Sequence, residues 1–285
     1  MVCGCKVTKK KCNFAAANHK KYYSKMKLNA KLALMAIVAV LPILGASAQD
    51  NDDNNEIETY LDADIVSHYM WRGTDMGGIS IQPEAYISWR GLTLKAEGNA
   101  GFDSTDPKEF DLTLGYERFG FNIGVTDYWA SGIDKNDRYF HYEKKGAHQL
   151  ELNLGYSWQY GSLQAYTIFW GNDYRISGKQ AYSTYLELSM PFKLGDVDFT
   201  AAVGGTPFES AGYDEVLENQ GFFGDETHYI HHYYYAEGPA CIMASLRATK
   251  TLDLGIAHLP IFAEVHANPY LQTANFLVGV TIAPF

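Results

Sequence analysis

The feature that most constrains this chain is an alternation of apolar and polar residues that recurs along most of its length. In LTLKAEG (92–98) leucine and alanine occupy the even positions, and threonine, lysine and glutamate occupy the odd ones. Successive side chains of a strand point to opposite faces, so this period of two indicates strands with one apolar side. The segments EFDLTLGYE (109–117) and QLELNLGYSW (149–158) repeat the pattern. The sequence therefore predicts an all-β fold.

About twelve segments carry this alternation, and short and long connections separate them in turn. The segments are 57–72, 79–90, 92–102, 109–118, 121–130, 148–159, 162–171, 180–192, 196–206, 239–251, 256–266 and 275–285. An even strand number, with short turns at one end and long polar loops at the other, is typical of a transmembrane antiparallel β-barrel of the bacterial outer membrane with both termini periplasmic. A soluble β-sandwich would also alternate. The strand lengths and the aromatic residues near strand ends favour the barrel.

The last segment, NFLVGVTIAPF (275–285), is expected to pair with the first, because lipid offers no water to an open sheet edge. Its terminal Phe285 resembles the C-terminal signal by which barrel-assembly machinery recognises its clients. The lipid-facing side of this segment is ambiguous, since positions 276, 278, 280 and 282 form one passable set and positions 277, 281 and 285 form another.

The N-terminal segment has a composition of its own. Residues 1–48 hold nine of the 23 Lys and Arg residues and none of the 33 Asp and Glu residues. Residues 26–48 predict a secretory signal peptide, with a basic start, an apolar core at 32–44 and cleavage near Ala48. Residues 1–25 are either an over-extended start or a longer basic region. Residues 49–56 predict a disordered acidic lead-in, which leaves 57–285 for the outer-membrane barrel.

The charge balance after the leader limits the partners of the chain. Residues 49–285 carry 14 basic and 33 acidic side chains, which excludes the basic face that nucleic-acid binding needs. Cys241 is the one cysteine in this part of the sequence, so an internal disulfide is excluded. The expected partners are outer-membrane lipid, the barrel-assembly machinery and small solutes, whereas the oligomeric state is left open.

The stretch VSHYMWRGTDMGGISIQP (66–83) is predicted to form the first hairpin of the barrel. Its alternation would turn Tyr69 and Trp71 toward lipid, with Trp71 and Arg72 where the hairpin leaves the membrane. The expected cross-strand pairs are Arg72 with Ser80, His68 with Glu84, and Asp62 with Arg90. A slip of one residue along the hairpin would remove these pairs.

These residues also carry a resemblance. HYMWRGTDMGGISIQPEAYISW (68–89) is similar to the aromatic-x-aromatic-Arg-Gly and downstream Gln-Pro signature near the start of the TorF-type outer-membrane porins, in a form typical of the Bacteroides group. The close match covers about residues 62–102, and the remainder agrees in length, strand rhythm and terminal aromatic. The resemblance implies an outer-membrane barrel. Residue by residue it extends to Trp71, Arg72, Gly73, Gln82 and Pro83, without a binding role for them.

Inward-facing positions are predicted to give the barrel an acidic, cation-favouring lumen, because nine acidic strand positions face Arg90, Lys95 and Arg247. The residues predicted to line the pore are Asp62, Asp64, His68, Arg72, Glu84, Arg90, Lys95, Glu97, Asn99, Asp111, Glu151, Asn153, Glu187, Asp198, Arg247, Glu264 and His266. A twelve-stranded barrel is wider than the eight-stranded kind that side chains fill and narrower than the 16-stranded porins.

Three functions fit such a barrel. The first is a narrow passive channel for small solutes, which needs no cofactor. The second is a plugged barrel that acts as an adhesin or receptor through loop 207–238, where Glu226, His228, His231 and His232 either gather a metal ion or belong to an extended strand. The third is an outer-membrane acyl hydrolase. We expect no enzyme, because Ser67 and His68 would point to opposite faces and no catalytic motif occurs.

Overall fold

The computed structural model describes residues 57–285 except 104–105, 107, 132–137, 222–223, 256–257 and 284–285, and it describes only the backbone at 216–221 and 224–229. The predicted signal peptide, the start of the chain, the acidic lead-in and Phe285 therefore lie outside the described residues. Within the described part, no helix has the length and apolar character to cross a membrane.

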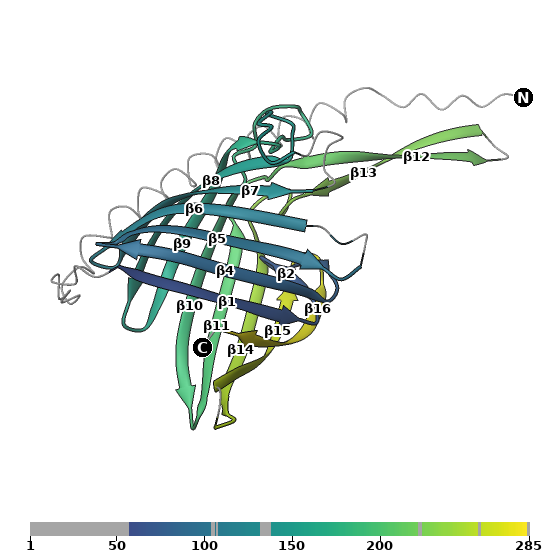
Figure 1. Cartoon of the computed structure of the whole chain (residues 1–285). Helices are drawn as coiled ribbons and strands as arrows, with labels where there is room; N and C mark the ends of the chain where they lie inside the picture. The colour runs from purple at the N-terminus through teal and green to yellow at the C-terminus, as the bar shows by residue number, and fades with distance from the viewer. Residues whose placement is uncertain are drawn as a thin grey trace, which may run out of the picture. The chain divides into compact units, whose positions relative to one another are not determined.

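Twelve of the described strands form a closed antiparallel barrel, as predicted (Figure 1). They are β1 (Glu58–Val66), β4 (Ser80–Trp89), β5 (Leu92–Gly101), β6 (Lys108–Arg118), β7 (Phe121–Ala130), β8 (His148–Trp158), β9 (Gly161–Gly171), β10 (Thr184–Leu194), β11 (Val197–Thr206), β14 (Ala240–Asp253), β15 (His258–Asn268) and β16 (Thr273–Ile282). Each strand pairs with its neighbours in the wall, and β1 closes the sheet against β16. The closed twelve-stranded antiparallel barrel and the closing pair are confirmed, whereas the periplasmic position of both termini stays a prediction.

Two hairpins lie outside the wall. The first consists of β2 (Tyr69–Trp71) and β3 (Thr74–Gly77) in the connection from β1 to β4, and the second of β12 (Gly212–Gly221) and β13 (Gly224–Tyr233) in the connection from β11 to β14. Figure 1 shows β12 and β13 as a long ribbon that runs away from the barrel wall. Both hairpins belong to the end of the barrel that carries the longer connections, which we call the loop end. The opposite end, with connections such as 119–120 and 159–160, is the short-turn end.

The two faces of the wall differ in polarity. Apolar residues on the outer face are about half exposed, among them Leu92, Leu94, Leu114, Ile123 and Leu154. The outward-facing side of strand β16, which the sequence left ambiguous, is the one that carries Phe276, Val278 and Ile282, because these residues are exposed. Leu277 is buried with Val66 and Phe262. A contiguous apolar surface of this kind needs an apolar solvent or a partner to cover it.

The expected register of the first hairpin is wrong. Strand β1 ends at Val66, which pairs with Ser80, so Asp62 lies opposite Glu84 rather than Arg90. The pairs of Arg72 with Ser80 and of His68 with Glu84 are therefore not formed either. Arg90 belongs to the two-residue turn before β5, where its guanidinium lies 5.0 Å from the centre of the Trp89 ring.

The register differs because the chain leaves the wall after Val66 instead of continuing to residue 72. Arg72 and Gly73 both have positive φ angles, 46° and 82°, and reverse the chain between β2 and β3. A Cβ atom at Gly73 would lie 2.0 Å from the carbonyl oxygen of Ile242 on β14. Glycine is needed here both for the backbone angle and for the close approach.

Candidate functional site

The hairpin β2–β3 lies inside the barrel and contacts widely separated strands. The Tyr69 hydroxyl donates to Glu109 on β6 at 2.6 Å, and Asn268 Nδ2 on β15 donates to the Gly73 carbonyl at 3.3 Å. Strands β6 and β15 are separated in the wall by β5, β4, β1 and β16. The hairpin therefore bridges the lumen.

Arg72 at the tip of the hairpin makes a bidentate ion pair with Glu151 on β8. Nη1 donates to Oε2 at 2.7 Å and Nη2 donates to Oε1 at 2.8 Å, with the two side chains 8% and 0% exposed. The hydroxyl of Tyr235 accepts a further hydrogen bond from Nη1 at 2.6 Å, and the hydroxyl of Tyr128 donates to Glu151 at 2.9 Å. A bidentate pair fixes orientation as well as distance.

Aromatic rings surround this ion pair. The Arg72 guanidinium lies 4.4 Å from the ring centre of Trp71, 4.3 Å from that of Tyr166 and 4.9 Å from that of Tyr185. Trp71 also stacks against Tyr235. The expectation that Tyr69 and Trp71 face lipid is thus wrong, because the inside–outside alternation of a wall strand stops applying once the chain turns into the lumen.

A network of hydrogen bonds at the loop end holds Tyr235 in position. The backbone N–H groups of Tyr235 and Ala236 donate to Ser210 Oγ at 2.9 and 3.1 Å. The N–H of Ala211 donates to Ser183 Oγ, and that hydroxyl donates to Asp173. Burial raises the pKa of the Asp173 carboxyl, against the opposing effect of the hydrogen bonds from Ser183.

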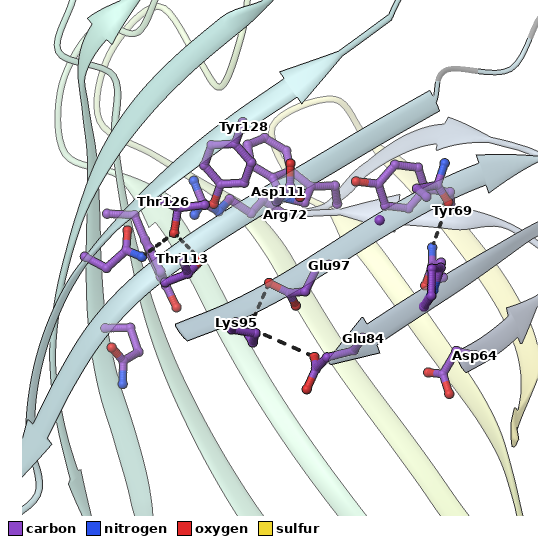
Figure 2. A pocket seen from close by; sticks show the side chains of 18 of the residues that line it. Asp64, Tyr69, Arg72, Glu84, Lys95, Glu97, Asp111, Thr113, Thr126 and Tyr128 are labelled. Atoms are coloured by element: carbon purple, nitrogen blue, oxygen red, sulfur yellow. Dashed lines mark hydrogen bonds and ion pairs between the residues drawn. The ribbon is translucent and has the colours of Figure 1, made fainter. Parts of the chain in front are cut away.

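A cavity of about 770 Å³ is lined by polar residues from β1 and β4 to β10 together with the hairpin (Figure 2). Ten of the seventeen residues predicted to line the pore lie on it: Asp62, Asp64, Arg72, Glu84, Lys95, Glu97, Asn99, Asp111, Asn153 and Glu187. Six of these are carboxylates and two are bases. Lys95 reaches Glu97 at 2.8 Å and Glu84 at 4.0 Å, as Figure 2 shows. We call this cavity the acidic chamber.

A second cavity, of about 730 Å³, is lined by the hairpin and by residues of the loop end, and we call it the vestibule. Tyr69, Trp71 and Tyr128 line both cavities. These three rings therefore form a partition between the vestibule and the acidic chamber.

Three more of the predicted residues gather on β14 and β15, beside Asp64. Arg247 lies 3.4 Å from Asp64 and 3.8 Å from Glu264, and its guanidinium is 3.5 Å from the ring centre of Phe262. His266 Nε2 lies 2.7 Å from Glu264. Asp64 joins this cluster to the acidic chamber.

The other predicted residues lie apart from both cavities. Asp198 pairs with Lys193 at 3.1 Å on the exposed surface, and neither His68 nor Arg90 lines the acidic chamber or the vestibule. Glu151 is fully buried beneath Arg72. The pore-lining residues predicted from the sequence did not include the tyrosines of the partition or those around Arg72, which are Tyr166 and Tyr185. The Arg72-Gly73 pair and the glycines at 77 and 78, which are turn signals inside an apparent strand, could have indicated the inserted hairpin.

The histidines of loop 207–238 belong to an extended hairpin. His231 pairs with Asp214 at 2.6 Å and His232 with Glu215 at 2.8 Å, each across β12 and β13. Among the side chains that the structure describes, no group of three potential metal ligands occurs. The side chains of Glu226 and His228 lie outside the described residues.

No family model and no curated protein matches the chain, so the resemblance to the TorF-type porins stays a prediction. A solved structure, Salmonella typhi OmpF in complex with daunomycin, is similar over 82% of this chain and 99% of that chain, at 11% identity and a TM-score of 0.33. The class defined here is a closed twelve-stranded β-barrel with an inserted hairpin, and it rests on the strand pairing of this chain itself.

Proposed function

We propose that the chain is an outer-membrane β-barrel that acts as a narrow passive channel for small cationic solutes, with no cofactor. The half-exposed apolar rows of the outer wall and the closed sheet support a lipid environment, because both are what a membrane-spanning β-structure requires. The signal segment predicted at 26–48 supports export.

The acidic chamber is the observation that carries the proposal. Its six carboxylates exceed its two bases, and Glu151, which is additional to the six, already pairs with Arg72. Confined carboxylates of one sign raise the local concentration of cations. Asp111 Oδ1 and Asn153 Oδ1 are buried there without a hydrogen-bond partner in the described structure. Buried polar atoms of this kind need water or a solute as partner.

The partition sets the size of the solute. On this proposal a solute passes Tyr69, Trp71 and Tyr128 to travel between the two cavities, so large solutes are excluded. The channel is therefore narrower than its number of wall strands alone would make it.

Conductance in planar bilayers tests the proposal. Purified folded protein should give discrete currents whose reversal potential in a KCl gradient shows cation selectivity. Glu84→Gln with Glu97→Gln should weaken that selectivity several-fold, whereas Glu143→Gln, at an exposed position in the connection from β7 to β8, should leave it unchanged. Anion-selective currents, or persistently silent membranes, would reject the channel.

Membrane insertion is tested by one pair of variants on β6. Leu112→Arg places a charge on the lipid side and should cost about 2–4 kcal/mol near the bilayer mid-plane, whereas the inward Asp111→Asn should impair assembly less. Refolding yield into vesicles measures the difference. Equal yields would contradict the assignment of the two faces.

A plugged barrel that acts as a surface receptor is the second candidate, and the hairpin β12–β13 favours it. These strands form a separate sheet with continuous pairing from Gly212↔Tyr233 to Gly221↔Gly224. The plugged barrel predicts that the intact protein carries no current. A variant that lacks the β2–β3 hairpin but keeps β12 and β13 should then conduct. A lipid-hydrolysis assay on the same sample tests the enzymatic alternative.

A further inference from the structure

The vestibule is aromatic, which distinguishes it from the acidic chamber. Seven of its eighteen lining residues are Tyr or Trp, and neither Lys nor Arg is among the described residues that line it. Lys145 lies close by, with its Nζ 5.4 Å from the ring centre of Tyr174. Glu109 is its carboxylate, and it accepts a hydrogen bond from Tyr69 at the partition. At the rim, Tyr213 is 65% exposed and stacks on His232. The vestibule thus combines aromatic rings, one of them exposed at the rim, with one lining carboxylate.

Ring faces attract cations that shed water easily, above all alkylated ammonium groups. A small inorganic cation such as Na⁺ keeps its water shell and gains little from tyrosine rings. A sugar would also stack on these rings, but it would gain nothing from the negative charge of Glu109. The volume of about 730 Å³ lies within the range of pockets that hold small organic molecules.

The acidic chamber adds a second criterion for the solute. The vestibule and the chamber adjoin at Tyr69, Trp71 and Tyr128, which line both cavities. A solute that moves from one cavity to the other meets first an aromatic surface with one carboxylate and then six carboxylates. An organic cation with an apolar body is favoured at both steps. A neutral sugar is favoured at the first step alone, and an inorganic cation at the second.

From this arrangement we propose that the solute class is organic cations, and that the vestibule is their binding site, with Glu109 as counter-charge and Tyr213 and Tyr233 among its ring faces. The inference rests on the proposed channel for the direction of travel, but binding to the vestibule is a separate property of the folded protein.

Binding of choline to the folded protein in detergent micelles tests the site. The matched neutral probe is 3,3-dimethyl-1-butanol, which has the shape of choline without its charge, and glucose represents sugars. Choline should bind about tenfold more tightly than the neutral probe, as expected for ring and carboxylate contacts together. Equal affinities for the two probes, or tighter binding of glucose, would overturn the assignment.

Two variants locate the binding. Glu109→Gln should weaken choline binding about fivefold or more and leave the neutral probe unaffected, because it removes charge and keeps an acceptor for Tyr69. Glu143→Gln, whose residue lines neither cavity, is the control. Since Glu109→Gln could disturb folding, Tyr213→Leu at the exposed rim gives a second reading and should weaken choline about two- to threefold. Undiminished choline binding in both folded variants would reject the site.

Currents carried by K⁺ and by choline in the same preparation separate this inference from the channel. Choline binding without any current keeps the site and rejects the channel. A K⁺ current without choline binding keeps the channel and rejects the site.

Discussion

Two arginine clusters inside the barrel differ in how they are built. Arg72, on the inserted hairpin, is 8% exposed, holds Glu151 with two hydrogen bonds of 2.7 and 2.8 Å and lies among three aromatic rings. Arg247, on wall strand β14, is 35% exposed, and its carboxylates lie at 3.4 and 3.8 Å. The Arg72 cluster is a buried ion pair with short contacts, whereas the Arg247 cluster is partly exposed and its contacts are longer.

The difference reflects what each arginine must hold. Strand β14 is fixed by backbone pairing with β11 and β15, so Arg247 adds little to its position. In the described part of the chain, β2 and β3 pair with each other and with no wall strand, so side-chain contacts must hold the hairpin in the lumen. A buried ion pair is costly to desolvate, and its best-attested role is to specify one arrangement. We assign that role to Arg72 and Glu151.

The largest expected effect comes from removing one partner of each pair. Glu151→Gln leaves the Arg72 charge buried and should lower the free energy of unfolding by about 3–5 kcal/mol. Glu264→Gln should cost about 1 kcal/mol or less, because Arg247 is partly solvated and keeps Asp64. Urea unfolding followed by tryptophan fluorescence compares the two variants. Similar losses would remove the distinction between the clusters.

A smaller effect is expected from exchanging the bases. Arg72→Lys keeps the charge but loses the two-pronged contact and the ring stacking, so it should destabilise by about 1–3 kcal/mol and make the hairpin accessible to protease at 67–79. Arg247→Lys loses the ring contact with Phe262 but no bidentate ion pair, so it should destabilise by about 1 kcal/mol or less and leave the hairpin protected from protease. Protease protection of the hairpin in Arg72→Lys would indicate that other contacts hold it.

The smallest effect concerns the hydrogen-bond network that positions Tyr235. No such network is described beside Arg247. Burial raises the pKa of Asp173, so protonation favours the folded state. The stabilising contribution is fully present below the ordinary carboxyl pKa and is lost as pH rises through the raised pKa. The melting temperature of the wild type should therefore improve on acidification relative to Asp173→Asn. A constant difference between the two proteins at pH 4 and pH 7 would show that Asp173 does not titrate in this way.

The wall could be predicted from the sequence because each strand has one lipid-facing and one inward face. Leu94 and Leu114 are exposed on the outer wall as the alternation predicts, and each segment lies within a few residues of its strand apart from the first. The first segment ran past Val66 because 67–72 happens to continue the alternation. Contacts with distant residues such as Ile242 and Asn268 decide its course, and no local pattern contains them.

The lining of the lumen was predicted in part, and for unequal reasons. Glu84, Glu97 and Asp111 lie on the acidic chamber because strand parity placed them inward. Arg72 also lies there, although it reaches the lumen on a hairpin rather than on a wall strand. Of the tyrosines around it, Tyr166 and Tyr185 stand on the wall strands β9 and β10. Tyr235 comes from a connection, and its position depends on the hydrogen bonds of Ser210.

The central claim is that the β2–β3 hairpin restricts the lumen. Replacing residues 68–78 with a short Gly-Ser turn should preserve the wall, since Val66 and Ser80 already pair. Single-channel conductance of this variant should be several-fold larger than that of the wild type, and selectivity for choline over K⁺ should fall. Unchanged conductance in a folded variant would contradict the claim.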